Sequence, residues 1–309
     1  MPSLPVGAKY ERKQSMKLLT YKYDGKEVLG ALTPDGQSVL PLEQLGFSFS
    51  SMNDLIDQIT EEQTEQLKSA VQNAACPSIP YDNVIKCAPI PVPKQDIICL
   101  GINYAAHAEE SARYKKETFE RNRDYAVYFS KRVNEAVADG APILSHSDLL
   151  ERLDYEAELA VVIGKDAEKV SAENAFDYVF GYTILNDISA REIQSRHKQW
   201  YFGKSLDGFC PMGPWIVTKD EFQNPPLLDI KSYVNGELRQ NSTTGLLIFS
   251  IAHVIEELSH GMKLKAGTII SMGTPAGVGM GFEPPKFMKP GDVVTCEIEG
   301  IGKLTNPVL

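Results

Sequence analysis

Short runs of β-favouring residues dominate the pattern of hydrophobic and polar positions after about residue 94. Most of these runs are bounded by Gly, Pro, Asn or Asp, which is typical of strands. We predict strands over 97–102, 126–130, 158–164, 179–187, 214–218, 230–236, 267–273 and 292–300. Helices are predicted after Tyr104, over 171–176 and over 251–260. Because strands and helices do not alternate regularly, a doubly wound parallel sheet is disfavoured.

The first quarter of the chain has a different pattern, with strands first and a helix after them. Residues 17–23 and 27–32 are β-favouring runs on either side of Asp24-Gly25, a dipeptide that favours a hairpin turn. Over 51–75, apolar residues recur at helical spacing among Glu, Gln and Lys, until prolines end the pattern. These features predict a small α+β unit.

A proline-rich stretch at 89–93 separates this unit from the strands that follow it. We therefore predict a small N-terminal domain over 16–93 and a main domain over 94–309. Met16 opens the first strand-like run, and residues 1–15 are predicted to be a disordered extension or a leader. The predicted fold class is mainly β with α+β elements.

Composition and charge narrow the classes of partner. The 309 residues include 41 Asp and Glu against 31 Lys and Arg, a formal net charge of −10. This balance argues against nucleic acid or an anionic membrane surface as the main partner. No apolar run approaches the roughly 20 residues of a membrane span. The five cysteines are scattered without a CxxC pair, which argues against a disulfide framework or a zinc knuckle and favours a cytoplasmic location.

Three carboxylates lie at the ends of two predicted strands. Glu156 and Glu158 stand two residues apart at the start of the strand predicted over 158–164, so their side chains project from one face. Two such carboxylates repel each other unless they are protonated or neutralised by a cation; the alternative is an exposed acidic strand end. Asp187 adds a third carboxylate at the end of the strand predicted over 179–187.

These carboxylates predict a site for a hard divalent cation. Glu156, Glu158 and Asp187 offer oxygen donors without a nearby His or Cys, a set that suits Mg²⁺ or Mn²⁺, with Ca²⁺ as a further choice, rather than zinc. Mg²⁺ prefers about six oxygen ligands, so three protein ligands would leave room for a bidentate substrate. That arrangement is typical of a catalytic site.

A histidine and a glutamate follow the strand predicted over 97–102. His107 and Glu110 stand three residues apart and share a face if the segment is helical. A carboxylate beside an imidazole orients the ring and raises its basicity, as a general base requires. An isolated pair of this kind is more often a surface feature, so the spacing alone leaves both interpretations open.

Two glycine-containing motifs resemble nucleotide-binding loops but are interpreted otherwise. The segment 277–281, Gly-Val-Gly-Met-Gly, is followed by prolines where a dinucleotide site needs a helix, so we interpret it as a flexible turn. Gly203-Lys204-Ser205 lacks the glycine that a phosphate-binding loop carries five residues earlier.

Further motifs occur in order along the main domain. They are Asn103-Tyr104, His107, Glu110, Phe129-Ser130-Lys131, Asp154-Tyr155-Glu156-Ala157-Glu158, Gly181-Tyr182-Thr183, Asn186-Asp187, Arg191, Gln194, Gly203-Lys204-Ser205, Pro211-Met212-Gly213-Pro214, Asn235-Gly236-Glu237 and Gly273-Thr274-Pro275-Ala276-Gly277. Together they resemble the fumarylacetoacetate hydrolase family over roughly residues 95–309. The small N-terminal domain and the segment 196–200 are most similar to a bacterial branch that includes oxaloacetate-decarboxylating members.

The resemblance implies a catalytic domain of mixed β-sandwich roll type, a homodimer, and Mg²⁺ or Mn²⁺ at the site. Glu156, Glu158 and Asp187 match the family's metal ligands, in agreement with the charge argument above. His107 and Glu110 match its His–Glu dyad, which lies on a segment that orders over the substrate.

The resemblance also implies which residues contact the substrate. Arg191, Gln194, Lys204 and Thr274 match positions that hold its carboxylate and oxo groups. Lys131 matches a further lysine near the site, although the next residue departs from the family's usual proline. The implied partner is a small anionic 2-oxo acid.

One principal function and two alternatives follow. We expect a divalent-metal-dependent hydrolase that cleaves a carbon–carbon bond in an acylpyruvate-type 2-oxo acid chelated by the ion. His107, held by Glu110, would deprotonate the attacking water, and the ion and Lys204 would stabilise the enolate that leaves. The same site would alternatively decarboxylate oxaloacetate or isomerise a related oxo acid. The second alternative is a non-enzymatic, metal-stabilised protein that binds oxo acids.

Overall fold

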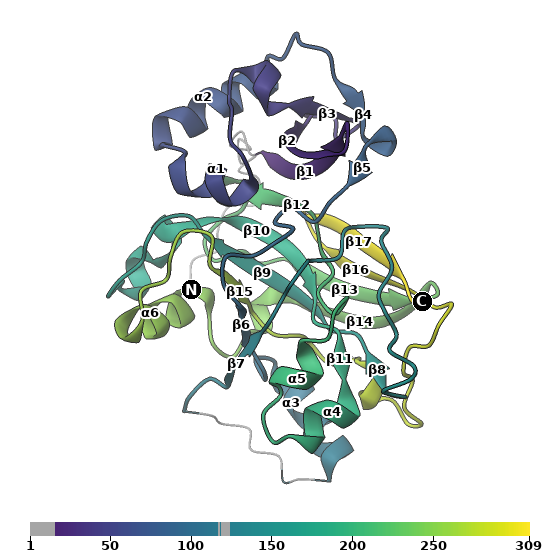
Figure 1. Cartoon of the computed structure of the whole chain (residues 1–309). Coiled ribbons are helices and arrows are strands. Elements are labelled where there is room, and N and C mark those ends of the chain that lie inside the picture. The colour runs from purple at the N-terminus through teal and green to yellow at the C-terminus, as the bar shows by residue number, and fades with distance from the viewer. Residues whose placement is uncertain (1–15, 117, 119–123) are drawn as a thin grey trace, which may run out of the picture.

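The computed structural model describes residues 16–116, 118 and 124–309, and these form a mainly β structure (Figure 1). The α-helices are α1 (Met52–Gln58), α2 (Glu61–Gln72), α3 (Ala105–Lys115), α4 (Arg191–Arg196), α5 (Tyr201–Lys204) and α6 (Ile251–Gly261). Helices α1 and α2 lie at one end of the molecule, and α3, α4 and α5 lie together at the other end (Figure 1). The predicted fold class is confirmed, whereas the prediction for residues 1–15 lies outside the described residues.

A large sheet runs through the molecule in the order β4-β3-β2-β1-β12-β10-β9-β15-β6-β7, with β5 paired to β1. Its strands are β1 (Lys17–Tyr23), β2 (Lys26–Leu32), β3 (Ser38–Pro41), β4 (Ile79–Pro80), β5 (Ile85–Lys86), β6 (Ile97–Leu100), β7 (Tyr128–Lys131), β9 (Ala157–Ile163), β10 (Val179–Asn186), β12 (Met212–Thr218) and β15 (Ile269–Ser271). Among these described strands, only β15 and β6 pair in parallel. This agrees with the prediction against a doubly wound parallel sheet.

Strand β9 lies in the middle of the large sheet and is buried along its whole length. Leu159 and Val161 belong to the core on one face of the sheet, and Ala160 and Val162 belong to the core on the other. A strand buried on both faces has apolar residues at successive positions, which explains the continuous apolar run in the sequence. The alternation also fixes the direction of the acidic residues at the start of the strand.

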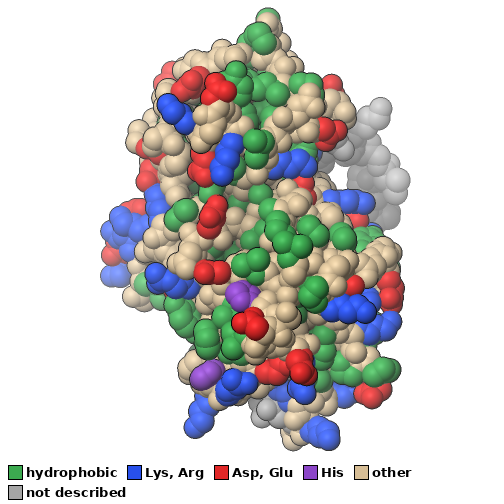
Figure 2. All heavy atoms as spheres, turned by 45° about the vertical axis from the view of Figure 1, so that its right-hand side comes forward, with side chains coloured by type: hydrophobic (Ala, Val, Ile, Leu, Met, Phe, Trp, Pro, Cys, Tyr) green, Lys and Arg blue, Asp and Glu red, His purple; other side chains and the backbone are tan. Residues whose placement is uncertain are grey.

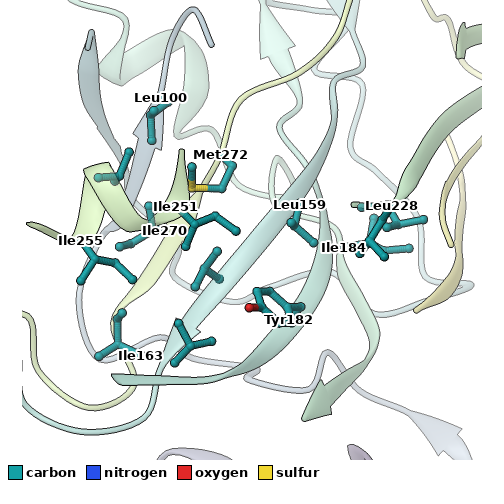
Figure 3. Close-up of a cluster of buried hydrophobic side chains, with 14 of the residues drawn as sticks. Leu100, Leu159, Ile163, Tyr182, Ile184, Leu228, Ile251, Ile255, Ile270 and Met272 are labelled. Carbon is teal, nitrogen blue, oxygen red and sulfur yellow. The ribbon is translucent and has the colours of Figure 1, made fainter. Parts of the chain in front are cut away.

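A four-stranded sheet covers one face of the large sheet. It consists of β14 (Glu237–Thr243), β13 (Asp229–Val234), β16 (Val293–Ile298) and β17 (Gly302–Pro307), in that order. The two sheets and helix α6 enclose a shared hydrophobic core, part of which is drawn in Figure 3. In that view Leu159 and Ile184 from the large sheet point into the same cluster as Ile251 and Ile255 of α6. This packing makes β9 and β10 the rigid centre of the main domain.

The N-terminal strands extend the large sheet, because β1 pairs with β12. The predicted hairpin is confirmed: Tyr23 pairs with Lys26, and Asp24 and Gly25 between them both have positive φ, as a two-residue turn requires. Instead of one helix over 51–75 there are two, because the chain is extended at Ile59 and α2 then starts with its own capping box. The domain division near residue 93 stays a prediction.

Several elements differ from the sequence predictions. The helix predicted over 171–176 is a 3₁₀ helix, η3 (Ala172–Tyr178), while α3 and α6 form as predicted. Strands β14 and β17, helices α4 and α5, and the two-stranded pair of β8 (Leu153–Asp154) with β11 (Ser189–Ala190) were not predicted. Such short or half-exposed segments carry weak periodicity, so their conformation depends on tertiary packing.

The surface gives no sign of a dedicated charged interface on the face in Figure 2, where acidic and basic side chains are interspersed. The described part of the chain also contains no helix that is long and apolar enough to cross a membrane.

Candidate active site

Glu156, Glu158 and Asp187 come together where β9 begins and β10 ends. One carboxylate oxygen of each lies within 4.8 Å of the others, and all three side chains are buried. The alternative of an exposed acidic strand end is therefore wrong. The antiparallel pairing places them together, because Leu185 is the register partner of Glu158 and Asn186 that of Ala157.

Local hydrogen bonds fix the backbone at this strand end. The side-chain oxygen of Asn186 accepts the N–H of Glu156 at 3.0 Å, and the carbonyl of Glu156 accepts the N–H of Asp187 at 2.9 Å. On the third carboxylate, one oxygen of Glu158 accepts the Ser271 hydroxyl at 2.6 Å and the Gly273 N–H at 3.0 Å. Ser271 had not been singled out in the sequence, because only the pairing of β15 with β9 brings it here.

Three buried cations, Lys131, Lys204 and Arg191, lie against Glu156 and Asp187. The ammonium of Lys204 lies 2.8 Å from Glu156 Oε2 and 2.7 Å from Asp187 Oδ2. The Nη1 atom of Arg191 lies 2.8 Å from Glu156 Oε1. Among the residues that the structure describes, no cation forms an ion pair with Glu158. The hydrogen-bond partners of Glu158 are the neutral groups of Ser271 and Gly273.

This asymmetry separates the two glutamates electrostatically. Burial raises the pKa of Glu158 well above its usual value, and the Asp187 and Glu156 charges raise it further. Burial also acts on Glu156, but Lys204 and Arg191 outweigh it and hold the pKa of that carboxyl below its usual value. Without a metal ion, Glu158 is therefore the glutamate that favours the protonated form, and Glu156 the one that favours the ionised form.

The donor set fits a hard divalent cation. Three buried carboxylates with oxygen atoms this close together repel one another unless protons or cations intervene, and no cysteine or histidine ligand belongs to the cluster. Glu156, Glu158 and Asp187 would hold the ion, and the raised pKa of Glu158 marks the position where the compensating charge is missing.

We expect the affinity for Mn²⁺ to increase with pH, because ion binding displaces the proton on Glu158. A carboxyl whose pKa is raised in the folded protein stays protonated to a higher pH than an ordinary glutamate, whose pKa is 4.5. The Mn²⁺ affinity should therefore rise with pH between that ordinary value and the raised pKa of Glu158. Calorimetry in two buffers of different ionisation enthalpy, between about pH 6 and 8, should detect a proton released with each ion. An affinity independent of pH, without proton release, would contradict the assignment.

His107 and Glu110 lie on α3, as predicted, and both side chains are buried. His107 Nδ1 lies 3.1 Å from Glu110 Oε2. If Nδ1 donates to the carboxylate, the Nε2 lone pair is left free to accept a proton. The interpretation of this pair as an incidental surface feature is therefore wrong.

His107 faces a narrow pocket of about 20 Å³ at the carboxylate cluster. The pocket is also lined by Glu156, Arg191, Gln194 and Lys204, so the predicted general base, one predicted ion ligand and two cations meet at one cavity. Arg191 Nη1 also donates to Gln194 Oε1 at 3.0 Å. The structure thus brings together five of the predicted site residues around one small volume.

A wider cleft of about 960 Å³ shares Gln194 and Trp200 with this pocket. Its lining includes the basic residues Lys115, Lys116, Arg152 and Lys198, and no acidic one among the residues that the structure describes. On a protein with net charge −10, such a cleft presents a locally positive approach to the inner pocket.

Two of the residues predicted to contact substrate, Thr274 and Lys131, do not line the pocket. The Thr274 hydroxyl donates to the Ala157 carbonyl at 2.9 Å and accepts from the Gln240 side chain at 2.7 Å. It therefore links the backbone next to Glu158 to Gln240. Lys131 is fully buried and donates to Asp187 Oδ1 at 2.7 Å and to the carbonyls of Ile188 and Lys204. A contact of either residue with substrate stays a prediction.

Replacing Lys131 by Met should destabilise the protein by about 3–5 kcal/mol, because Asp187 loses one buried partner and two carbonyls lose their donor. Urea unfolding of the metal-free protein measures this change. Lys303→Met, on the exposed side of β17, is a matched control that should stay within about 0.5 kcal/mol of the parent. Equal stabilities of the two variants would show that Lys131 does not hold Asp187.

The glycine-rich loop, residues 277–281, contributes to the site through its backbone, which the sequence prediction missed. The N–H of Gly277 donates to Glu110 Oε1 at 2.9 Å. The N–H groups of Gly279 and Met280 donate to Asp154 at 2.6 and 3.0 Å. The segment was predicted to be a flexible turn; it ends in the 3₁₀ helix η6 (Gly279–Gly281) and is largely buried, and its amides bind carboxylates. The spacing of glycines two apart, which allows close backbone approach, was the available signal.

Comparisons with known proteins agree on one family. The family model described as fumarylacetoacetate (FAA) hydrolase C-terminal matches residues 96–309. Among curated proteins, oxaloacetate tautomerase YisK of Bacillus subtilis is 48% identical over 221 residues, which are 72% of this chain and 72% of that protein.

Solved structures show the same similarity. A fumarylacetoacetate hydrolase from Exiguobacterium antarcticum superimposes with a TM-score of 0.80 at 38% identity, covering 95% of this chain and 99% of the other. A maleylpyruvate hydrolase from Sphingobium sp. SYK-6, solved in complex with manganese(II) and pyruvate, has a TM-score of 0.75 at 28% identity, covering 95% and 99%.

Proposed function

The chain belongs to the fumarylacetoacetate hydrolase family, and from this premise we propose that it is a divalent-metal-dependent enzyme that enolises a short 2-oxo acid, with oxaloacetate as the first candidate. The observation that carries the proposal is the juxtaposition of a His–Glu dyad with a carboxylate triad at one narrow pocket. The similarity to an oxaloacetate tautomerase supports the choice of substrate.

The cations of the pocket suit the anionic end of such a substrate. Arg191 Nη2 is buried and has no hydrogen-bond acceptor in suitable geometry among the described residues, although it lies 2.9 Å from Asp154 Oδ2. A substrate carboxylate would accept from this donor, and Gln194 beside it would hold the same end. The small volume of the pocket favours a short carbon chain.

Proton transfer follows from the position of His107. Its free Nε2 would take a proton from the carbon next to the 2-oxo group, while Glu110 stabilises the imidazolium through Nδ1. Lys204 would balance the charge that develops on the enolate oxygen. A divalent ion held by Glu156, Glu158 and Asp187 would supply Lewis-acid polarisation of the oxo group. Return of the proton to oxygen completes a tautomerisation.

Hydrolysis of an acylpyruvate is the second candidate, and the similarity to a maleylpyruvate hydrolase with bound pyruvate favours it. In that reaction His107 would deprotonate a water that attacks the distal carbonyl, and the carbon–carbon bond would break to release the pyruvate enolate. Decarboxylation of oxaloacetate would form the same enolate without a water. All three reactions need the same cations to stabilise an enolate, whereas only tautomerisation and hydrolysis need His107 as a base.

Product analysis tests the proposal and separates these reactions. Oxaloacetate and a panel of acylpyruvates are incubated with the protein, with Mn²⁺ and with a chelator. Faster loss of the enol absorbance at constant total oxaloacetate supports tautomerisation; pyruvate with CO₂ supports decarboxylation; pyruvate with a carboxylic acid supports hydrolysis. If no 2-oxo acid turns over with Mn²⁺ or Mg²⁺ although pyruvate or oxalate binds, the enzyme proposal fails and the non-enzymatic binding function gains.

A further inference from the structure

Asp154 is a fully buried carboxylate beside the site, and the proposed reaction assigns it no role. It lies on β8, two residues before Glu156, and its two oxygens accept four hydrogen bonds. Two of these come from the glycine-rich loop, through Gly279 at 2.6 Å and Met280 at 3.0 Å. Another comes from Arg191 Nε at 2.9 Å.

The glycine-rich loop connects this carboxylate to the dyad. At one end the loop binds Asp154, and at the other the N–H of Gly277 binds Glu110 Oε1, whose second oxygen contacts His107. Arg113 of α3 also donates to the carbonyl of Gly281 at 3.0 Å. The contact leaves no space: a Cβ on Gly281 would lie 1.7 Å from Glu110 Oε1.

Arg191 connects Asp154 to the carboxylate cluster in the other direction. Its Nε donates to Asp154, while its Nη1 lies 2.8 Å from Glu156 Oε1 and donates to Gln194. Asp154 thus stands in a continuous chain of hydrogen bonds that runs from His107, through the glycine-rich loop, to Glu156. The Tyr155 hydroxyl adds a second link, because it donates to the Gly277 carbonyl at 2.9 Å from the position next to Glu156.

We propose that Asp154 is a positioning residue that fixes the general base relative to the ion-binding carboxylates by holding the glycine-rich loop and Arg191 at once. The proposal rests on the proposed function, in which His107 is the base and Glu156 an ion ligand. The base and the ion ligand lie on segments far apart in the sequence, so their separation needs a shared anchor. Displacement of a catalytic group by a fraction of an ångström is costly in rate.

Asp154→Asn is the informative variant, because it keeps the size of the side chain. An amide has one accepting oxygen, so the loop and Arg191 can no longer both be satisfied. We expect kcat to fall about 10–100-fold and KM to rise several-fold, as Arg191 loses orientation. A variant that is merely less folded would show a lower kcat at an unchanged KM. Asp292→Asn, a buried aspartate that binds Asn235 and the Lys289 N–H, is the matched control.

A double-mutant cycle tests whether Asp154 acts through the dyad. If it does, Glu110→Gln combined with Asp154→Asn should lie within about threefold of the worse single variant in kcat/KM. If the effects of the two single variants multiply, Asp154 does not act through Glu110 and the proposal is overturned. Failure of the proposed function is a separate outcome, seen as absence of turnover by the parent protein.

Hydrogen–deuterium exchange followed by mass spectrometry gives a readout that needs no turnover. Asp154→Asn should accelerate exchange both in peptides covering 277–281 and in α3, while Asp292→Asn should change neither. If Asp154→Asn fails to fold, Arg191→Lys provides the same test from the other end of the chain of hydrogen bonds. Unchanged exchange in α3 in whichever variant folds would overturn the proposal.

Discussion

Replacement of Glu158 by glutamine is expected to leave the metal-free protein folded and to remove its metal-dependent activity. Glutamine reproduces the protonated carboxyl that burial and the neighbouring charges favour, and its oxygen still accepts from Ser271 and Gly273. The ion, however, loses a charged ligand. We expect Mn²⁺ affinity to fall by at least about 100-fold, because even residues behind a ligand cost 10–100-fold. Turnover should fall by about 1000-fold or more at a fixed ion concentration.

The same change at Glu156 should have a different outcome. Glu156→Gln leaves Arg191 and Lys204 with less compensating negative charge in a buried site, so the free energy of unfolding should fall by about 3 kcal/mol. Urea unfolding and Mn²⁺ titration on both variants make the comparison. Glu297→Gln, on β16, serves as the control. If Glu158→Gln binds Mn²⁺ like the parent, the triad is not the ion site.

His107→Asn should abolish proton transfer while the ion site stays intact. The His107 side chain lines the pocket together with Lys204, and loss of a general base costs about 100- to 10,000-fold in kcat. Mn²⁺ affinity should change less than about threefold, since His107 does not belong to the carboxylate triad. Steady-state kinetics on the substrate identified by product analysis, together with Mn²⁺ titration, measure both quantities.

Glu110→Gln should have a smaller effect than His107→Asn, because glutamine still accepts from His107 Nδ1 but does not stabilise the imidazolium by charge. His260→Asn is a matched control at the end of α6, where the ring contacts a backbone carbonyl. A fully active His107→Asn variant would remove this residue from the mechanism and would leave Lys204 as the remaining candidate for proton transfer.

Local patterns in the sequence predicted the parts of the site that depend on neighbours in the chain. Residues two apart in a strand share a face, which placed Glu156 beside Glu158 before the fold was known. Residues three apart in a helix share a face, which paired His107 with Glu110. The strong apolar runs of β9 and β10 were equally clear, because both faces of these strands are buried.

The roles of the cations and of the glycine-rich loop were beyond the reach of such patterns. Lys131 matched a lysine near the site, but its hydrogen bonds to Asp187 and two carbonyls depend on the packing of β7 against α5. Asp154 belongs to one of the sequence motifs, but the sequence alone assigned it no role, because its partners Gly279 and Met280 lie about 125 residues further along the chain.

The sequence by itself therefore determined the β-rich class, the Glu156–Glu158 pair and the His107–Glu110 pair, because these depend on local strand or helix geometry. The pairing of β9 with β10 then brings Asp187 to the two glutamates. The tertiary structure decided which glutamate stays ionised, which cations lie against it, and which backbone amides hold the dyad. Those properties arise from contacts between segments far apart in the chain, from Lys204 with Glu156 at a separation of 48 residues to Gly277 with Glu110 at 167. Burial then makes each contact decisive, because a charge removed from water depends on the few groups that remain beside it.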